Sequence, residues 1–280
     1  MKLIYLHGQK EDPNVTHITF PTGEKHIRIL GLKPSDDVVL VYNDSSGDIM
    51  KLALAVNICR RARVQSLELV MPFVPYARQD RVAVPGDPLS IKVFADFLNS
   101  MRFDRVLMTD PHSDITPALI DNSDVIPQHE IAAKAVLETH QKVGCPLALV
   151  APDLGAAKKT KALQQYIKQI ANALFPIIQC DKTRDVTTGQ ITGFQVLEGQ
   201  PIFHHCFMVD DICDGGGTFL GLAATINRYP NVQGQSLYVT HGIFSKGVEA
   251  LGAVFANIYA SDSFPSVDGV QTIQLGDKNE

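Results

Sequence analysis

Short runs of apolar, β-branched residues alternate along the chain with longer segments whose apolar residues recur every three to four positions. The first pattern is typical of buried strands and the second of amphipathic helices, so their alternation predicts parallel β-α-β units. In the first half we expect strands at 38–42, 67–73 and 105–109, and helices at 49–61 and 90–99, the second capped by Ser90. In the second half we expect strands at 147–151, 175–179, 203–209 and 237–240, with helices after Gly155, Thr218 and Ser245.

This alternation occurs twice, which predicts an α/β fold of two tandem Rossmann-like domains with mainly parallel sheets. Ahead of it, HITF and HIRI flank PTGEK over residues 17–29, a pattern typical of a β-hairpin. The stretch 121–128 is polar and contains a proline, as expected of a connection, although part of it can be a strand. We therefore place the domain boundary near Pro127, with domains at 1–127 and 128–280.

Composition narrows the class of protein and its partners. The formal net charge is −5 and the pI is near 6.0, so the surface is not built to neutralise a polyphosphate backbone, and we expect no nucleic-acid partner. The five cysteines are far apart and form no CxxC pair, which favours a reducing compartment. No apolar run approaches bilayer length, and the one in MKLIYLHG is too short for a signal peptide. We expect a cytoplasmic protein with no membrane partner.

The most specific pattern is FMVDDICDGGGTF at 207–219, where an apolar strand ends in two acids and a glycine run leads into a helix at Thr218. Backbone amides and a helix N-terminus that converge in this way form a phosphate-binding loop. Asp210 and Asp211 lie where open α/β sheets place their ligands, so they are candidates to hold ribose hydroxyls or hydrated magnesium. A glycine-rich turn with two capping acids is the alternative, and the coincidence of acids, glycines and helix start favours the phosphate loop.

Other candidate residues also follow predicted strands. Asp153 in LVAPDLGAAKK is a possible magnesium or sugar ligand, although alone it is more often a helix cap. Lys182 and Arg184 follow a strand in CDKTRD, where a mobile cationic loop would stabilise the charge of a reacting polyphosphate, or would simply be solvated. In the first half, Arg, Gln and His side chains that could contact phosphates or a base follow two strands: Arg78, Gln79, Arg81 and His112.

These residues resemble the ribose-phosphate diphosphokinases, also called phosphoribosyl pyrophosphate synthetases. The resemblance spans nearly the whole chain and rests on PYARQDR (75–81), DPH (110–112), PD (152–153), DKTR (181–184), VDDICDGGGT (209–218) and THGIFS (240–245), in the family's order and approximate spacing. It implies two phosphoribosyltransferase-like domains that transfer the β,γ-diphosphoryl group of ATP to the anomeric hydroxyl of ribose 5-phosphate, leaving AMP. Magnesium is the implied cofactor and ATP the co-substrate.

The resemblance also assigns roles to residues. The implied ATP contacts are Phe20, Glu24, Arg78, Gln79, Arg81 and His112, with His112 and Asp153 as metal ligands. The implied catalytic groups are Lys182, Arg184 and His112. Asp210 and Asp211 would bind ribose hydroxyls, and the 5-phosphate would lie against Asp214, Gly215, Gly216, Gly217 and Thr218. A homo-oligomer with the nucleotide site near a subunit interface is implied as well.

Three departures from the family pattern leave alternatives open. Gly215 stands where the family's DTGGT or DTAGT loop has threonine, which would admit a bulkier acceptor such as ADP-ribose, giving an ADP-ribose diphosphate suited to NAD synthesis. Thr22 replaces the aspartate of the family's FxDGE hairpin, and the N-terminus ahead of this hairpin is short.

A phosphoribosyltransferase would not need the ARQDR, DPH or DKTR motifs. A non-catalytic regulatory relative would not need His112, Lys182 and Arg184.

Overall fold

The computed structural model describes residues 1–280 except 7–12, 46–48, 185–190, 199–203 and 276–280, and it leaves out the side chains of residues 184, 191 and 192. The chain forms two compact units, Met1–Ile126 and Pro127–Glu280, each with its own sheet. In the described ranges no helix is both long and apolar enough to cross a membrane.

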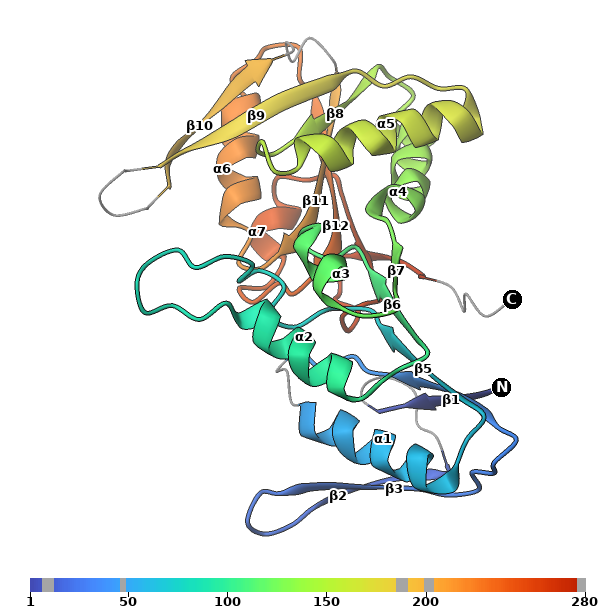
Figure 1. The fold of residues 1–280 in the computed structure, drawn as a ribbon. Coiled ribbons are helices and arrows are strands. Elements are labelled where there is room, and N and C mark those ends of the chain that lie inside the picture. The colour runs from blue at the N-terminus through green and yellow to red at the C-terminus, as the bar shows by residue number, and fades with distance from the viewer. Residues whose placement is uncertain (7–12, 46–48, 185–190, 199–203, 276–280) are drawn as a thin grey trace. The chain divides into compact units, whose positions relative to one another are not determined.

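The first unit is built on a five-stranded parallel sheet in the order β1-β4-β5-β6-β7. Its strands are β1 (Lys2–Tyr5), β4 (Asp37–Val41), β5 (Ser66–Met71), β6 (Arg105–Thr109) and β7 (Ser123–Ile126). The helices are α1 (Ile49–Ala62), α2 (Ser90–Ser100) and the short α3 (Ile115–Leu119) (Figure 1). The order of the strands in this sheet follows their order in the chain.

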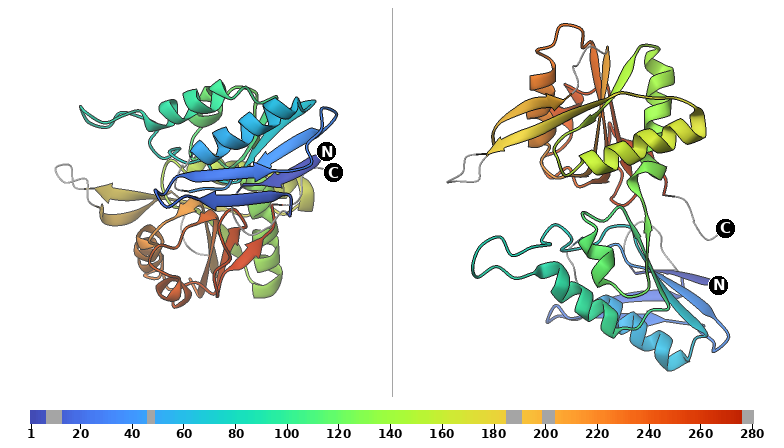
Figure 2. Two further views of the ribbon diagram at one scale, coloured as in Figure 1. Left: turned by 90° about the horizontal axis from the view of Figure 1, so that it is seen from below. Right: turned by 45° about the horizontal axis from the view of Figure 1, so that its top comes forward.

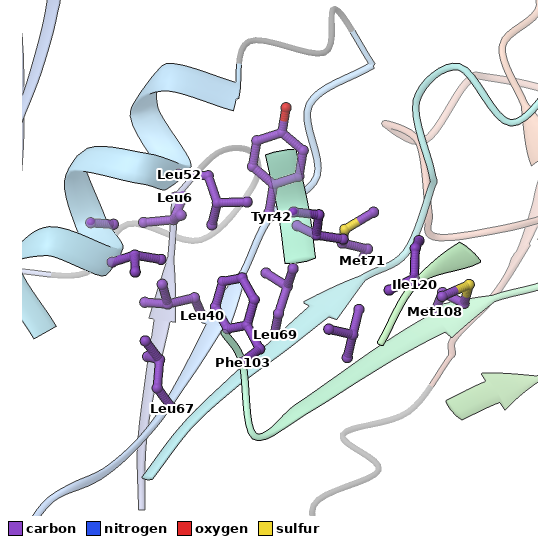
Figure 3. Close-up of a cluster of buried hydrophobic side chains, with 14 of the residues drawn as sticks. Leu6, Leu40, Tyr42, Leu52, Leu67, Leu69, Met71, Phe103, Met108 and Ile120 are labelled. Atoms are coloured by element: carbon purple, nitrogen blue, oxygen red, sulfur yellow. The ribbon is translucent and has the colours of Figure 1, made fainter. Parts of the chain in front are cut away.

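One apolar cluster joins this sheet to α1 and α2. Alternate residues of the strands, among them Leu40, Leu69 and Met71, point to the same face and pack with Leu52 of α1 (Figure 3). From α2 the cluster takes Ile91, Phe94, Ala95 and Leu98, which recur at helical spacing. The apolar residues that recur at every second position in the strands and about every 3.6 positions in the helices therefore pack together in one buried layer.

The predicted hairpin is present, formed by β2 (Val15–Thr19) and β3 (Lys25–Ile29) in antiparallel register. Ile27 and Ile29 alternate with exposed residues and are buried in the core of the unit, where β3 packs against α1. The turn from Phe20 to Glu24 closes through two backbone hydrogen bonds, Phe20 N–H to Glu24 O (2.9 Å) and Gly23 N–H to Phe20 O (2.8 Å).

The second unit has a seven-stranded sheet in the order β10-β9-β8-β11-β12-β13-β14, parallel except for the β9–β10 pair. Helices α4 (Gln128–Val143) and α5 (Ala157–Ala171) cover one face, and α6 (Gly217–Ile226) and α7 (Glu249–Gly252) cover the other (Figure 2). The strands are β8 (Leu147–Ala151), β9 (Ile177–Arg184), β10 (Ile191–Glu198), β11 (His205–Cys213), β12 (Gly234–Gly242), β13 (Asn257–Ser261) and β14 (Gln271–Ile273). The α/β fold with two mainly parallel sheets is thus confirmed.

Some local predictions were wrong. Ser90 is the first residue of α2 rather than its cap, since Leu89 occupies the N-cap position without a side-chain hydrogen bond. Strand β9 does not stop at residue 179 but continues to Arg184, because β10 pairs with it antiparallel. Lys182 and Arg184 therefore belong to a strand and not to a loop. Strand β11 likewise runs through Asp210 and Asp211 to Cys213, because β12 pairs with it up to Gly242.

Candidate functional site

In the second unit the candidate residues lie near the carboxyl ends of three neighbouring strands, β9, β8 and β11. From β8 the sheet grows in one direction through β9 to β10 and then reverses to β11, so β8 and β11 flank a topological switch point. The β8–β11 ladder ends at Val150 and Met208, whereas β11 continues beside β12. The end of β11 is thus left open on the β8 side, where Asp153 follows.

Asp153 and Lys182 form an ion pair across this edge. The Lys182 Nζ lies 2.7 Å from the Asp153 Oδ2, and the two side chains are only 17% and 27% exposed. The Asp153 Oδ1 accepts a hydrogen bond of 2.9 Å from the backbone N–H of Ala156, at the start of α5. Although burial alone would raise it, the pKa of Asp153 is lowered by Lys182 and by this N–H group. The N-cap of α5 is Ala156 and not Asp153, so the helix-cap interpretation of Asp153 is wrong, although its carboxylate bonds to the Ala156 N–H.

Asp210 and Asp211 of β11 lie near this ion pair. The pKa of Asp210 is raised well above its usual value, because its carboxyl group is shielded from water and lies near the carboxylates of Asp211 and Asp153. The Asp210 Oδ1 accepts the backbone N–H of Asp211 at 2.9 Å, while Lys159 Nζ lies 3.7 Å from the Asp211 Oδ2. Three acids and two lysines, Lys159 and Lys182, therefore share one end of the sheet.

The predicted phosphate loop joins β11 to α6. Gly216 is buried and adopts φ = 76°, a left-handed conformation that favours glycine, and it forms the N-cap of α6. The first N–H groups of a helix have no acceptor within the helix, so they are available to an anion at this end. Asp214, two residues before Gly216, is held by Ser245 of the THGIFS segment. Its Oδ1 accepts the Ser245 hydroxyl (2.6 Å), and its backbone oxygen accepts the Ser245 N–H (3.0 Å).

The neighbouring Gly215 is in contact with a lysine. A Cβ atom added to Gly215 would lie 3.2 Å from Cδ, 3.3 Å from Cε and 3.5 Å from Cγ of Lys246. The backbone of Gly215 does not itself require glycine, since its φ is outside the left-handed region. The place of the missing side chain is thus taken by the lysine methylenes.

The hairpin that carries Lys182 and Arg184 packs on the helix that follows the phosphate loop. The ring of Phe194 in β10 lies directly over Gly221 of α6, so close that a Cβ at this position would overlap it. Phe194 also packs against the core of the second unit. The side chain of Arg184 and residues 185–190, where we expected a mobile cationic loop, lie outside the described residues. The described part of the hairpin is nevertheless tied to α6.

The donor set fits a magnesium ion that arrives with its substrates. Magnesium favours carboxylate oxygens and usually takes one or two of them together with water and substrate phosphates. Asp153, Asp210 and Asp211 each offer carboxylate oxygens near this edge, where shielding from water and the neighbouring carboxylates raise the pKa of Asp210. Over the described ranges, no three His, Cys, Asp or Glu side chains form a complete metal-binding cluster.

In the first unit, the candidate nucleotide residues lie on the segments after β5 and β6. Arg78, Gln79, Arg81 and His112 are all exposed. The chain turns outward at Tyr76, whose φ is 64° and whose ring packs on Phe94 of α2 (centroids 5.7 Å apart). The Gln79 backbone is fixed by Gln79 N–H to Tyr76 O (3.0 Å). Ahead of His112, the buried Asp110 adopts φ = 38° and accompanies a sharp change of chain direction.

Phe20 and Glu24 lie together at the tip of the β2–β3 hairpin. The Phe20 side chain is 46% exposed, and its ring is 6.0 Å from that of His26. The Thr22 hydroxyl donates to the Glu24 Oε2 at 2.8 Å. The residue that departs from the family's hairpin therefore bonds to the acid that is retained.

Sequence reasoning missed two lysines of the second unit, Lys159 and Lys246. Lys159 follows PDLG by a short interval at the start of α5, and this position on a helix that leaves the site was an available signal. Lys246 contacts Gly215 only because β12 and the loop after it lie beside β11, so no local pattern reveals it.

Comparisons with known proteins agree with this geometry. A family model described as the N-terminal domain of ribose phosphate pyrophosphokinase matches residues 4–101. The chain is 28% identical to a ribose-phosphate pyrophosphokinase of Agrobacterium fabrum, over 92% of this chain and 82% of that protein. It is 29% identical to one of Mycoplasma pneumoniae, over 82% and 68% of the two chains.

Among solved structures, the fold matches the crystal structure of phosphoribosylpyrophosphate synthetase from Mycobacterium smegmatis. The TM-score is 0.82 at 18% sequence identity, covering 98% of this chain and 95% of that chain. Both units of the fold are therefore present in the matched structure.

Proposed function

Since the chain belongs to the ribose-phosphate pyrophosphokinase family, we propose that it transfers the β,γ-diphosphoryl group of ATP to the anomeric hydroxyl of ribose 5-phosphate. The products are phosphoribosyl pyrophosphate and AMP. The observation that carries this proposal is the shared end of β8, β9 and β11, where the Asp153–Lys182 pair and the acids of β11 stand beside the phosphate loop.

The acceptor is assigned to the second unit. Its 5-phosphate binds the loop Asp214–Thr218 at the N-terminus of α6, where N–H groups and the helix dipole favour an anion. Asp210 and Asp211 accept hydrogen bonds from the ribose hydroxyls. Ser245 holds Asp214 in place from the neighbouring loop.

The reaction needs alignment and charge stabilisation more than a covalent nucleophile. The anomeric oxygen attacks the β-phosphorus, the bond from that phosphorus to the oxygen bridging to the α-phosphate breaks, and AMP leaves with that oxygen. We assign Lys182, Arg184 and His112 to stabilise the charge on the transferred group. The ion pair with Asp153 holds the Lys182 ammonium at the strand end before substrates arrive.

We assign the nucleotide to the first unit and magnesium to both substrates. Arg78, Gln79, Arg81 and His112 are exposed and would contact ATP, and Phe20 with Glu24 would contact the adenine across a subunit boundary. Asp153 and His112 are the proposed metal ligands. Bound magnesium would neutralise phosphate charge and polarise the transferring group.

We also propose a homo-oligomer. Val93 and Phe97 of α2 are 52% and 57% exposed, and such side chains at adjacent turns form an apolar surface suited to another subunit. Sedimentation of the purified chain tests this directly, and a monomer at micromolar concentration would contradict it.

The function is tested by AMP release from ATP and magnesium, with ribose 5-phosphate and ADP-ribose in parallel and products identified by mass. We expect phosphoribosyl pyrophosphate from ribose 5-phosphate. Product from ADP-ribose alone would replace this acceptor by the larger one while leaving the reaction class intact. No AMP with either acceptor, from a folded chain, would contradict the enzyme assignment and favour a regulatory relative.

The alternative function, a phosphoribosyltransferase, differs from the proposed one because it consumes phosphoribosyl pyrophosphate instead of making it. Such an enzyme would consume phosphoribosyl pyrophosphate and a base without using ATP. Incubation of the chain with phosphoribosyl pyrophosphate and free bases should therefore release no diphosphate.

A further inference from the structure

We propose that Lys246 is a specificity-determining residue of the acceptor site, where its ammonium binds the phosphate group attached to the 5-position of the ribose. This inference rests on the proposed function, because it concerns the loop assigned to that phosphate. The motifs that carry the family resemblance end at Ser245, so they assign Lys246 no role.

The first support is the contact with Gly215. Three successive carbons of Lys246, Cγ, Cδ and Cε, lie 3.2 to 3.5 Å from the position a Cβ of residue 215 would take. A side chain on residue 215 would therefore require these lysine carbons to shift by a few tenths of an ångström. Since the φ of Gly215 is not left-handed, Lys246 and not the backbone is what such a side chain would meet.

The other two glycines of the loop have different reasons or none. Gly216 needs its positive φ of 76°, and a Cβ there would also meet Leu251 at 3.2 Å. A Cβ on Gly217 would meet nothing within 4 Å. Only Gly215 is matched to a cationic side chain.

The second support is how firmly Lys246 is anchored beside the loop. The preceding residue, Ser245, donates two hydrogen bonds to Asp214, at 2.6 and 3.0 Å. The following residue, Gly247, donates its N–H to Phe244 O at 2.9 Å and adopts φ = 74°. The backbone of Lys246 is thus fixed on both sides, which leaves the side chain to run across Gly215.

The chemical consequence is that the phosphate loop has the positive charge of the Lys246 ammonium in place of the threonine hydroxyl of the family's loop. The Lys246 ammonium is one bond beyond Cε, and the residue is exposed, so the group is accessible to a ligand. Hydrogen bonds between charged partners are stronger than neutral ones, whereas exposure makes them sensitive to salt. We therefore expect Lys246 to favour acceptors that carry phosphate at the 5-position and to make their binding depend on ionic strength.

The test uses Lys246→Met, which keeps a chain of similar length over Gly215 and removes only the charge. Binding of ribose 5-phosphate and of ADP-ribose is measured by calorimetry at two salt concentrations, and steady-state KM and kcat are measured for active acceptors. We expect the acceptor Kd and KM to rise about tenfold or more. The KM for ATP and kcat should stay near wild type, and the salt dependence of binding should flatten. Lys246→Arg should restore binding.

Matched variants separate charge from packing. Lys134→Met removes an exposed lysine from α4, away from the loop in sequence, and should leave every constant unchanged. Gly215→Thr should weaken acceptor binding when Lys246 is present but have little effect in the Lys246→Gly background, where the threonine has room. Equal effects of Gly215→Thr in both backgrounds would contradict the coupling between the two residues.

Failure of this inference differs from failure of the proposed function. If the wild type releases AMP but Lys246→Met keeps the wild-type acceptor Kd and KM, the function stands and the role of Lys246 is refuted. If the wild type is inactive but binds ribose 5-phosphate through Lys246, the inference stands without the reaction. A wild type that binds neither acceptor overturns both.

Discussion

Four candidate residues of the first unit, Arg78, Gln79, Arg81 and His112, are exposed on the segments that follow β5 and β6. Lys182 of the second unit instead belongs to β9 and is paired with Asp153, whose carboxylate accepts the Ala156 N–H at the start of α5. The second unit thus has an organised site, in which a strand and an ion pair position the candidate cation, whereas the first unit carries its candidate cations on exposed segments.

The largest expected effect comes from the organised site. Lys182→Ala removes a cation from the proposed transition state and leaves Asp153 unpaired, so kcat should fall by about 10² to 10³-fold, and further with Arg184→Ala. Circular dichroism should show a folded chain, because the pair lies at the end of the sheet and is partly exposed. A variant with more than a tenth of the wild-type kcat would mean that Lys182 does not contact the reacting group.

A smaller effect, of a different kind, is expected in the first unit. Arg78→Ala should raise the KM for ATP by about tenfold, because an exposed charged contact to phosphate is lost. The acceptor KM and the melting temperature should not change. If the acceptor KM rises equally, Arg78 does not act through the nucleotide, and the contrast between the two units fails.

The smallest effect on rate should come from the packing of β10 on α6, which supports the organised site. Gly221→Ala places a methyl group against the Phe194 ring, so the free energy of unfolding should fall by about 1 to 3 kcal/mol through overpacking. The displaced hairpin should lower kcat several-fold.

Gly193→Ala is the matched control for this variant. Gly193 lies beside Phe194 in β10, and no described atom lies within 4 Å of its added Cβ, so the melting temperature of this variant should stay near that of wild type. The destabilisation by Gly221→Ala should also shrink in the Phe194→Ala background. If it does not, the contact is not its cause.

The strands that could be predicted are the continuous apolar runs. The run at 147–151 is β8 and the one at 105–109 is β6, both with the bounds expected, because a buried parallel strand is apolar on both faces. The missed elements lack this signature. Helix α4 begins at Gln128, the last residue of the stretch that we interpreted as a connection, and we predicted no helix directly after it. In β10 apolar residues alternate with polar ones. Strand β14 has only three residues.

The candidate site was predictable in its kinds of residue but not in its contacts. The acids and glycines of 207–219 identify a phosphate loop from local order alone. The pairing of Lys182 with Asp153 joins residues of different strands, and the contact of Lys246 with Gly215 joins two loops. Such contacts depend on strand order, which periodicity does not specify.

The two strand orders also have a consequence for synthesis on the ribosome. In the first unit each parallel strand can join the growing sheet as it emerges, because β1, β4, β5, β6 and β7 are neighbours in the order they are made. In the second unit β8 acquires β9 on one side while its other edge waits for β11, which begins more than fifty residues later at His205. An unpaired apolar edge is prone to aggregation. The edge of β8 in the nascent second unit is therefore exposed to aggregation until β11, the strand that leads into the phosphate loop, pairs with it.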